Sequence, residues 1–176
     1  LIDNLNKIVE RFDYNEDFHF SLLRDRKGVS LERIAFDVPT NRRESWFSAA
    51  ATEGYATPGY RNSQQKREGS SGGTISIEPK VFTPDEDGQS DFTTIFYRFA
   101  NSGNVANITI YDSRGREVKQ LARNQLLATE GFFIWDGTNE QRAKVRTGYY
   151  VVMLQVYNLD GSQEFIKETV AVTDRF

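Results

Sequence analysis

The sequence predicts an all-β protein made of two regions, and three observations support this. Residues 74–176 contain extended segments of alternating apolar residues, separated by turns rich in glycine and aspartate. Within them, an aromatic segment enters a turn at Asp136-Gly137, and a polar loop then leads into a long apolar segment. A stretch rich in glycine, serine and polar residues, 64–73, precedes this region and is typical of a flexible linker.

The long segment 149–157 defines the centre of the predicted sheet. Its residues are apolar on both faces, with Tyr149 and Val151 on one face and Tyr150 and Val152 on the other. A strand of this kind needs cover on both sides and belongs in the middle of a sheet. With its neighbours it predicts a seven-stranded antiparallel sandwich of the immunoglobulin kind over 74–176. The predicted strands are 74–78, 92–99, 105–111, 117–121, 132–135, 149–157 and 164–172.

The first region, residues 1–63, is less regular. Residues 7–14 fit a strand or a helix, and we favour the strand because Asp3, Asn4 and Asn6 precede it as turn formers. Residues 17–23 and 28–36 are further strand candidates. The aromatic residues Trp46, Phe47 and Tyr55 are expected to anchor an irregular segment to the sheet. About four strands in some sixty residues bury little surface, so we expect this region to lean on another part of the protein or on a partner.

Composition excludes several classes of protein. The net charge of −3 and the absence of a basic cluster argue against a nucleic-acid or anionic-membrane surface. The lack of cysteine excludes disulfides, thiolate metal sites and cysteine nucleophiles. No apolar run approaches the roughly 20 residues of a transmembrane helix. Phosphate-binding loops, dinucleotide fingerprints and zinc-protease motifs are absent from the sequence, so no reaction centre is evident.

Residues 75–176 resemble a known family. The strings IYDSRGREVKQL, FIWDGTN and TGYYVVMLQV resemble the Ig-like domain of the flagellar hook-capping protein. The opening VFTPDEDGQSDFTTI is similar to the start of the gliding-motility-associated C-terminal domain of secreted Bacteroidetes proteins, except that Glu86 stands where that family usually has glycine. The ending Asp174-Arg175-Phe176 also differs from the lysine-rich ends of many type IX sorting domains.

The first region resembles the second half of a bacterial lamin tail domain. The strings that carry this resemblance are KGVSLERIAF, ESWFSAA and GYATPGYRNS. It implies a partial lamin-tail Ig-like β-sandwich in residues 1–63. The missing half would be supplied by an upstream part of the same polypeptide.

One acidic loop is a candidate cation site. Asp85, Asp87 and Asp91 stand close together around Gly88, and calcium takes six to eight oxygen ligands. These three aspartates are the candidate calcium ligands, with the carbonyl of Gln89 assisting. The alternative, which we favour, is an acidic turn in which the aspartate side chains accept hydrogen bonds from local backbone N–H groups. No other cofactor is predicted.

Two further residues have a structural and a functional interpretation. His19 is the only histidine and would have to be the base of any Ser-His-Asp arrangement. It lies between two phenylalanines in an alternating segment, and the structural interpretation is preferred. Trp135 is either a sugar-stacking residue or a core residue, and we favour the core because a buried indole contributes a large apolar surface.

The sequence therefore predicts a non-enzymatic interaction module of a cell-surface or secreted protein associated with the outer membrane. Its expected partners are proteins, in particular outer-membrane or secretion-system components, and the 74–78 or 164–172 edge would accept a partner strand. The alternative is the targeting and accessory tail of a secreted hydrolase whose catalytic domain lies upstream. An export signal for type IX secretion and an assembly scaffold also remain open.

Overall fold

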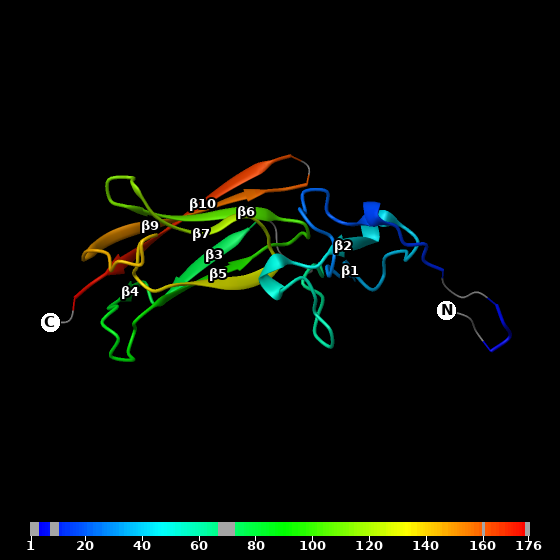
Figure 1. Ribbon diagram of the computed structural model, residues 1–176, viewed down its shortest axis with the longest axis horizontal. Helices are drawn as coiled ribbons and strands as arrows, with labels where there is room; N and C mark the ends of the chain where they lie inside the picture. The colour runs from blue at the N-terminus through cyan, green and yellow to red at the C-terminus, as the bar shows by residue number, and fades with distance from the viewer. Residues whose placement is uncertain (1–3, 8–10, 67–72, 160, 175–176) are drawn as a thin grey trace.

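The computed structural model describes residues 4–7, 11–66, 73–159 and 161–174 (Figure 1). Its regular structure consists of β-strands and three short 3-10 helices, so the all-β prediction is confirmed. A sandwich formed by residues 74–172 occupies one end of an elongated molecule, and the smaller N-terminal part caps the other end (Figure 1). No helix among the described residues is long and apolar enough to cross a bilayer.

Two sheets face each other in the sandwich. The five-stranded sheet has the order β4-β10-β9-β6-β7, and the three-stranded sheet has the order β3-β5-β8. Neighbouring strands are antiparallel except β4 and β10, which are parallel. The strands are β3 (Thr74–Glu78), β4 (Val81–Phe82), β5 (Thr93–Arg98), β6 (Val105–Asp112), β7 (Glu117–Leu126), β8 (Glu130–Trp135), β9 (Gly148–Tyr157) and β10 (Gln163–Val172).

Strand β9 lies in the middle of the five-stranded sheet, as its two apolar faces predict. Its inward residues Tyr150, Val152, Leu154 and Val156 are buried in the core between the sheets. Trp135 is fully buried opposite them and is the largest side chain of that core. One continuous apolar interior of this size is what stabilises an independent sandwich.

All seven strands predicted in this region are present, and two details differ. The two-residue strand β4 was not predicted, because a segment this short shows no alternation. Strand β7 continues to Leu126, five residues beyond the predicted end, through bulges in its pairing with β6. Of the two expected edges, β3 lies at the edge of its sheet, whereas β10 lies between β9 and β4 at Ala171 and Val172.

The N-terminal part contains less strand than predicted. Its regular elements are η1 (Glu16–Phe18), β1 (Leu31–Arg33), η2 (Arg43–Ser45), β2 (Trp46–Ser48) and η3 (Ala51–Glu53), and β1 pairs with β2. The strand predicted at 17–23 is wrong, because the Asn15 side chain accepts the Asp17 N–H and starts a 3-10 turn. The strand predicted at 28–36 shrinks to β1. In the strand predicted at 7–14, residues 8–10 lie outside the described residues and 11–14 are not strand.

Buried Glu32 on β1 organises this part. Its carboxylate accepts hydrogen bonds from the Thr57 hydroxyl, from the Ser63 hydroxyl at 2.6 Å and from the Gln64 N–H at 3.1 Å. Ser63 Oγ in turn accepts the N–H of Ala50 at 2.8 Å. A buried carboxylate is tolerated when donors surround it, so Glu32 holds the segment 57–64 against β1 and β2.

The next residues fasten this part to the sandwich. The Gln64 side chain donates to the Leu127 carbonyl at 3.1 Å and accepts the Gly103 N–H at 2.9 Å. The backbone carbonyl of Gln64 accepts a hydrogen bond from the Ser102 hydroxyl. The Thr129 N–H donates to the Ser63 carbonyl at 2.8 Å. Gln64, which the sequence assigns to the linker, is thus fully buried in the joint, and residues 67–72 of that segment lie outside the described residues.

Candidate functional site

The acidic loop between β4 and β5 gathers the three predicted aspartates. Each of Asp85, Asp87 and Asp91 offers a carboxylate oxygen, and these oxygens lie within 4.8 Å of one another. The loop is exposed to solvent over most of its length. The sequence therefore located three acidic groups that do converge in space.

Backbone N–H groups of the same loop bond to these carboxylates. Asp91 accepts the N–H of Glu86 at 2.6 Å and of Gly88 at 2.8 Å, and Asp87 accepts the N–H of Gln89 at 2.8 Å. Partial burial raises the pKa of Asp91, but the backbone N–H groups of this loop outweigh it, so the net pKa is lowered. This is the hydrogen-bonded acidic turn that the sequence offered as the alternative to a calcium site.

The backbone conformation at residue 86 is one that glycine adopts most easily. Glu86 has a φ of 63°, in the left-handed region, where the family usually has glycine. Gly88 follows with a φ of 85°. Asp91 bonds the N–H groups of both residues, which holds the turn although residue 86 carries a side chain. With one oxygen from each carboxylate, the three aspartates supply fewer than the six to eight oxygens that calcium prefers, so a cation here would take its remaining ligands from water or backbone carbonyls.

His19 is buried between two hydroxyl groups. Its Nδ1 lies 3.0 Å from Ser48 Oγ, and its Nε2 lies 3.0 Å from the Tyr14 hydroxyl. Burial, followed by the positive charge of Arg26, lowers the pKa of His19. Ser48 is itself fully buried, and its hydroxyl accepts the Phe20 N–H. Solvent is therefore excluded from the contact between His19 and Ser48. The contacts support the structural interpretation of His19.

Trp135 is a core residue, as predicted. Its ring contacts Phe82 and Tyr150 edge-on, with centroids 5.4 and 5.1 Å away, and its Nε1 donates to the Thr138 carbonyl at 2.9 Å. The indole is fully buried. The sugar-stacking interpretation is wrong, because no face of the ring reaches solvent.

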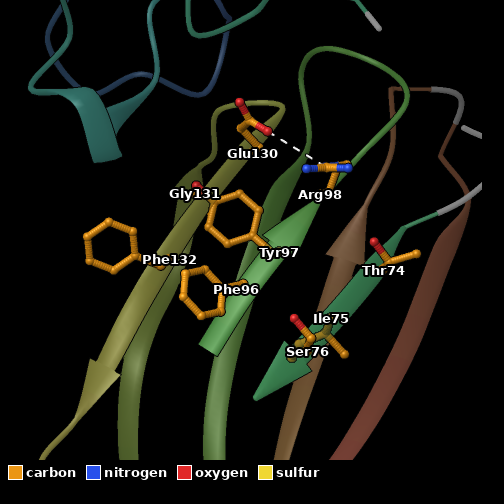
Figure 2. A pocket seen from close by; sticks show the side chains of 9 residues that line it. All are labelled: Thr74, Ile75, Ser76, Phe96, Tyr97, Arg98, Glu130, Gly131 and Phe132. Atoms are coloured by element: carbon orange, nitrogen blue, oxygen red, sulfur yellow. Dashed lines mark ion pairs between the residues drawn. The ribbon is translucent and has the colours of Figure 1, made fainter. Parts of the chain in front are cut away.

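The outer face of the three-stranded sheet carries a hollow that the sequence analysis missed (Figure 2). It has a volume of about 470 Å³ and extends over β3, β5 and β8. The Arg98 and Glu130 side chains, 3.6 Å apart, close one end, and the rings of Phe96 and Phe132 lie toward the other. The signal was present in the sequence, because Phe132 and Ile134 alternate with Phe133 and Trp135 and cannot all face the core.

Solved structures that are similar to part of this chain include FlgD, PorZ and PorU. FlgD of P. aeruginosa is 21% identical over 46% of this chain and 62% of its own, with a TM-score of 0.38. PorZ of Porphyromonas gingivalis, described as an essential surface component of the type IX system, is 22% identical over 56% and 11%, with a TM-score of 0.35. Latent PorU of the same organism is 20% identical over 62% and 10%, with a TM-score of 0.42.

This chain thus spans about six tenths of the FlgD structure and about a tenth of PorZ and PorU. No curated protein sequence matches it. A family model does match: the CHU_C type IX secretion signal domain aligns with residues 75–171, which is more than half of the 176 residues and includes nearly the whole sandwich. A protein with such a domain is secreted or placed on the cell surface. The chain belongs to the CHU_C type IX secretion signal domain family.

Proposed function

We propose that residues 74–176 form a non-catalytic docking module that outer-membrane components of the type IX machinery recognise during export. The family match carries this proposal, since it extends from the second residue of β3 to Ala171 in β10. Recognition by a partner needs a stable surface rather than a reaction centre, and a sandwich with a continuous core supplies one.

The positions of the candidate catalytic side chains support a role in binding rather than in catalysis. The single histidine is buried against Ser48 and Tyr14, away from the acidic loop. The hollow on the three-stranded sheet is lined neither by His19 nor by Asp85, Asp87 or Asp91. The Ser48 hydroxyl does lie 3.0 Å from His19, but both residues are buried, so a substrate would not reach this pair.

We further propose that the N-terminal part is the second half of a lamin-tail-like domain completed by an upstream segment of the same polypeptide. The sheet β1-β2 has only two strands among the described residues, and the segment that follows it bonds to β1 through side chains such as that of Asn62, which donates to the Arg33 carbonyl at 2.9 Å. Phe36 and Tyr60 are almost fully exposed there. Large aromatic side chains left in water on so small a unit favour cover by another segment.

Reporter export tests the docking role. Fusions of a fluorescent reporter to residues 74–176, to 1–176 and to 1–66 would be expressed in a bacterium with an intact type IX system and in the same strain lacking the translocon. We expect the first two fusions to reach the medium or cell surface only in the intact strain, and the 1–66 fusion to stay in the periplasm. Periplasmic retention of both fusions that contain the sandwich would reject the proposal.

A further inference from the structure

Strand β8 has one open edge. It pairs with β5 and with no other described strand. The Phe99 N–H donates to the Thr129 carbonyl at 2.7 Å, which fixes the alternation of the ladder. In an antiparallel pair, alternate residues bond to the neighbour and the others point away from it. The backbone groups of residues 131, 133 and 135 therefore face β5, and those of Phe132 and Ile134 face the open side.

The side chains along this edge are apolar and exposed. Phe132 is 58% exposed and Ile134 is 49% exposed, and both lie on the outer face of the sheet. Phe96 of β5 continues this apolar surface, with its ring centroid 6.2 Å from that of Phe132. In Figure 2 the ring of Phe132 projects from β8 on the side away from β5. An unpaired backbone row beside exposed apolar side chains is the arrangement that accepts an added strand.

The edge of the facing sheet is built differently. Strand β7 has bulges in its pairing, and Arg123 is exposed on it. Its outer backbone is also occupied, because the Glu140 N–H donates to the Val118 carbonyl at 3.1 Å and the Gln120 N–H donates to the Glu140 carboxylate at 2.6 Å. Bulges, charges and covering loops are the devices that protect sheet edges. Residues 131–134 contain no charge, no proline and no bulge.

Charges at the two ends of this edge are already neutralised. Glu130 pairs with Arg98 at 3.6 Å at one end, and Asp136 pairs with Lys119 at 2.9 Å at the other. A partner segment with charges in its middle would meet apolar side chains and no counter-ion. The site is therefore complementary to a segment that is uncharged in its centre.

We propose that the open edge of β8 is a strand-addition site for an extended, uncharged segment of a partner protein with apolar residues at alternate positions. The added strand would bond to the backbone of Phe132 and Ile134 and lay its apolar residues beside the side chains of Phe132 and Ile134. The strand-addition site gives the docking role a surface and a partner chemistry. Its biological setting rests on the proposed function. It places strand addition at β8 rather than at residues 74–78 or 164–172.

A defined peptide tests this site on the full chain. The probe is the synthetic peptide acetyl-Lys-Thr-Val-Thr-Val-Thr-Val-Lys-amide, which alternates apolar residues and has charges only at its ends. Amide hydrogen exchange measured by NMR would report which strand the peptide covers. We expect it to slow exchange of the Phe132 and Ile134 amides at least tenfold. Amides on the unpaired edge of β3 are expected to be unaffected.

Two variants of equal charge sharpen the test. Phe132→Lys puts a protecting charge on the edge, and Phe165→Lys changes a residue of similar exposure, 54%, on β10 of the facing sheet. We expect the first to weaken peptide binding at least tenfold and the second to leave it unchanged, with both variants folded by circular dichroism. Protection at β3 or β7, no binding to the parent chain, or equal binding by both variants would overturn the proposal.

Sedimentation of the parent chain without peptide tests whether a second copy of this chain occupies the edge instead. We expect a monomer, and a dimer abolished by Phe132→Lys would overturn the proposal by assigning the edge to a second copy. Peptide binding does not depend on the secretion machinery. Reporter export that proceeds while the peptide fails to bind would reject the strand-addition site and leave the export role intact.

Discussion

The two parts of this molecule are stabilised in different ways. The sandwich buries one continuous set of apolar side chains around Trp135. Among the residues that the structure describes, the N-terminal part buries the apolar side chains of Ile34, Ala49 and Ala50, and its other buried groups are polar, including Glu32, His19 and Ser48. Apolar burial supplies most of the folding free energy, whereas a buried polar network mainly fixes geometry. We therefore expect the sandwich to fold by itself and the N-terminal part to depend on the segments it contacts.

Removing the tryptophan should have the largest effect. Trp135→Ala leaves a cavity between Phe82 and Tyr150 and frees the Thr138 carbonyl, so we expect the free energy of unfolding to fall by about 3–5 kcal/mol. Chemical denaturation followed by circular dichroism measures this loss. The matched control is Trp46→Ala in the N-terminal part, which should leave the transition of the sandwich in place. An equal loss for both would contradict the division described above.

Cutting the joint should cost less and act locally. Gln64→Ala leaves the Leu127 carbonyl and the Gly103 N–H without their partner in a buried position, and we expect a loss of about 1–3 kcal/mol. Hydrogen exchange should then rise around Ala49 and Ala50 while the core of the sandwich stays protected. Gln65→Ala is the control, because the side chain of Gln65 accepts an exposed hydrogen bond from Arg61 at 2.9 Å. Uniform exchange through the whole chain would argue against a separable N-terminal part.

Acid should destabilise the N-terminal part more than the sandwich. The pKa of His19 is lowered in the folded state, so the unfolded chain binds more protons as the pH falls through about 6.5. Stability from neutral His19 is therefore present above that pH and decreases below it. His19 is the only histidine, and we expect the slope between pH 7 and 5 to disappear in His19→Gln. A slope that persists in this variant would assign the effect to another group.

The acidic loop should give the smallest effect on stability. Backbone N–H groups of the loop, among them those of Glu86 and Gly88, bond to Asp91 and lower its pKa, so Asp91→Ala is expected to lower the melting temperature by more than Asp87→Ala. The lowered pKa of Asp91 implies that its contribution is present above the unfolded pKa and is lost as the pH falls toward the folded value.

Calcium binding by this loop stays a proposal with a simple measurement. Because local N–H groups already bond to Asp87 and Asp91, we expect millimolar calcium to leave the melting temperature unchanged. A melting temperature that rises when calcium is added would instead assign the loop to a cation. This rise should be absent in Asp87→Asn and should not be reproduced by sodium at equal ionic strength.

How far the sequence predicts the structure differs between the two parts. In the sandwich, the alternation of apolar residues and the glycine turns were enough to predict seven strands that the structure contains. This works because a buried face of a sheet imposes a period of two. In the N-terminal part, residues 17–23 alternate equally well, yet the Asn15 cap and the partners of His19 determine their path. The contact of His19 with Ser48 joins residues far apart in the chain, so the local pattern does not reveal it. The open edge of β8 required the topology, since the sequence does not say which strand lies beside residues 130–135.

The Gln64 joint also has a mechanical consequence. It seats the N-terminal part at one end of the sandwich, while the residues that follow β10 leave from the opposite end (Figure 1). A pull between these ends runs along β10, which is aligned with β9 over ten residue pairs. Tension in that direction strains the whole row of hydrogen bonds together instead of opening them one at a time. The fold is therefore arranged to resist stretching along its long axis.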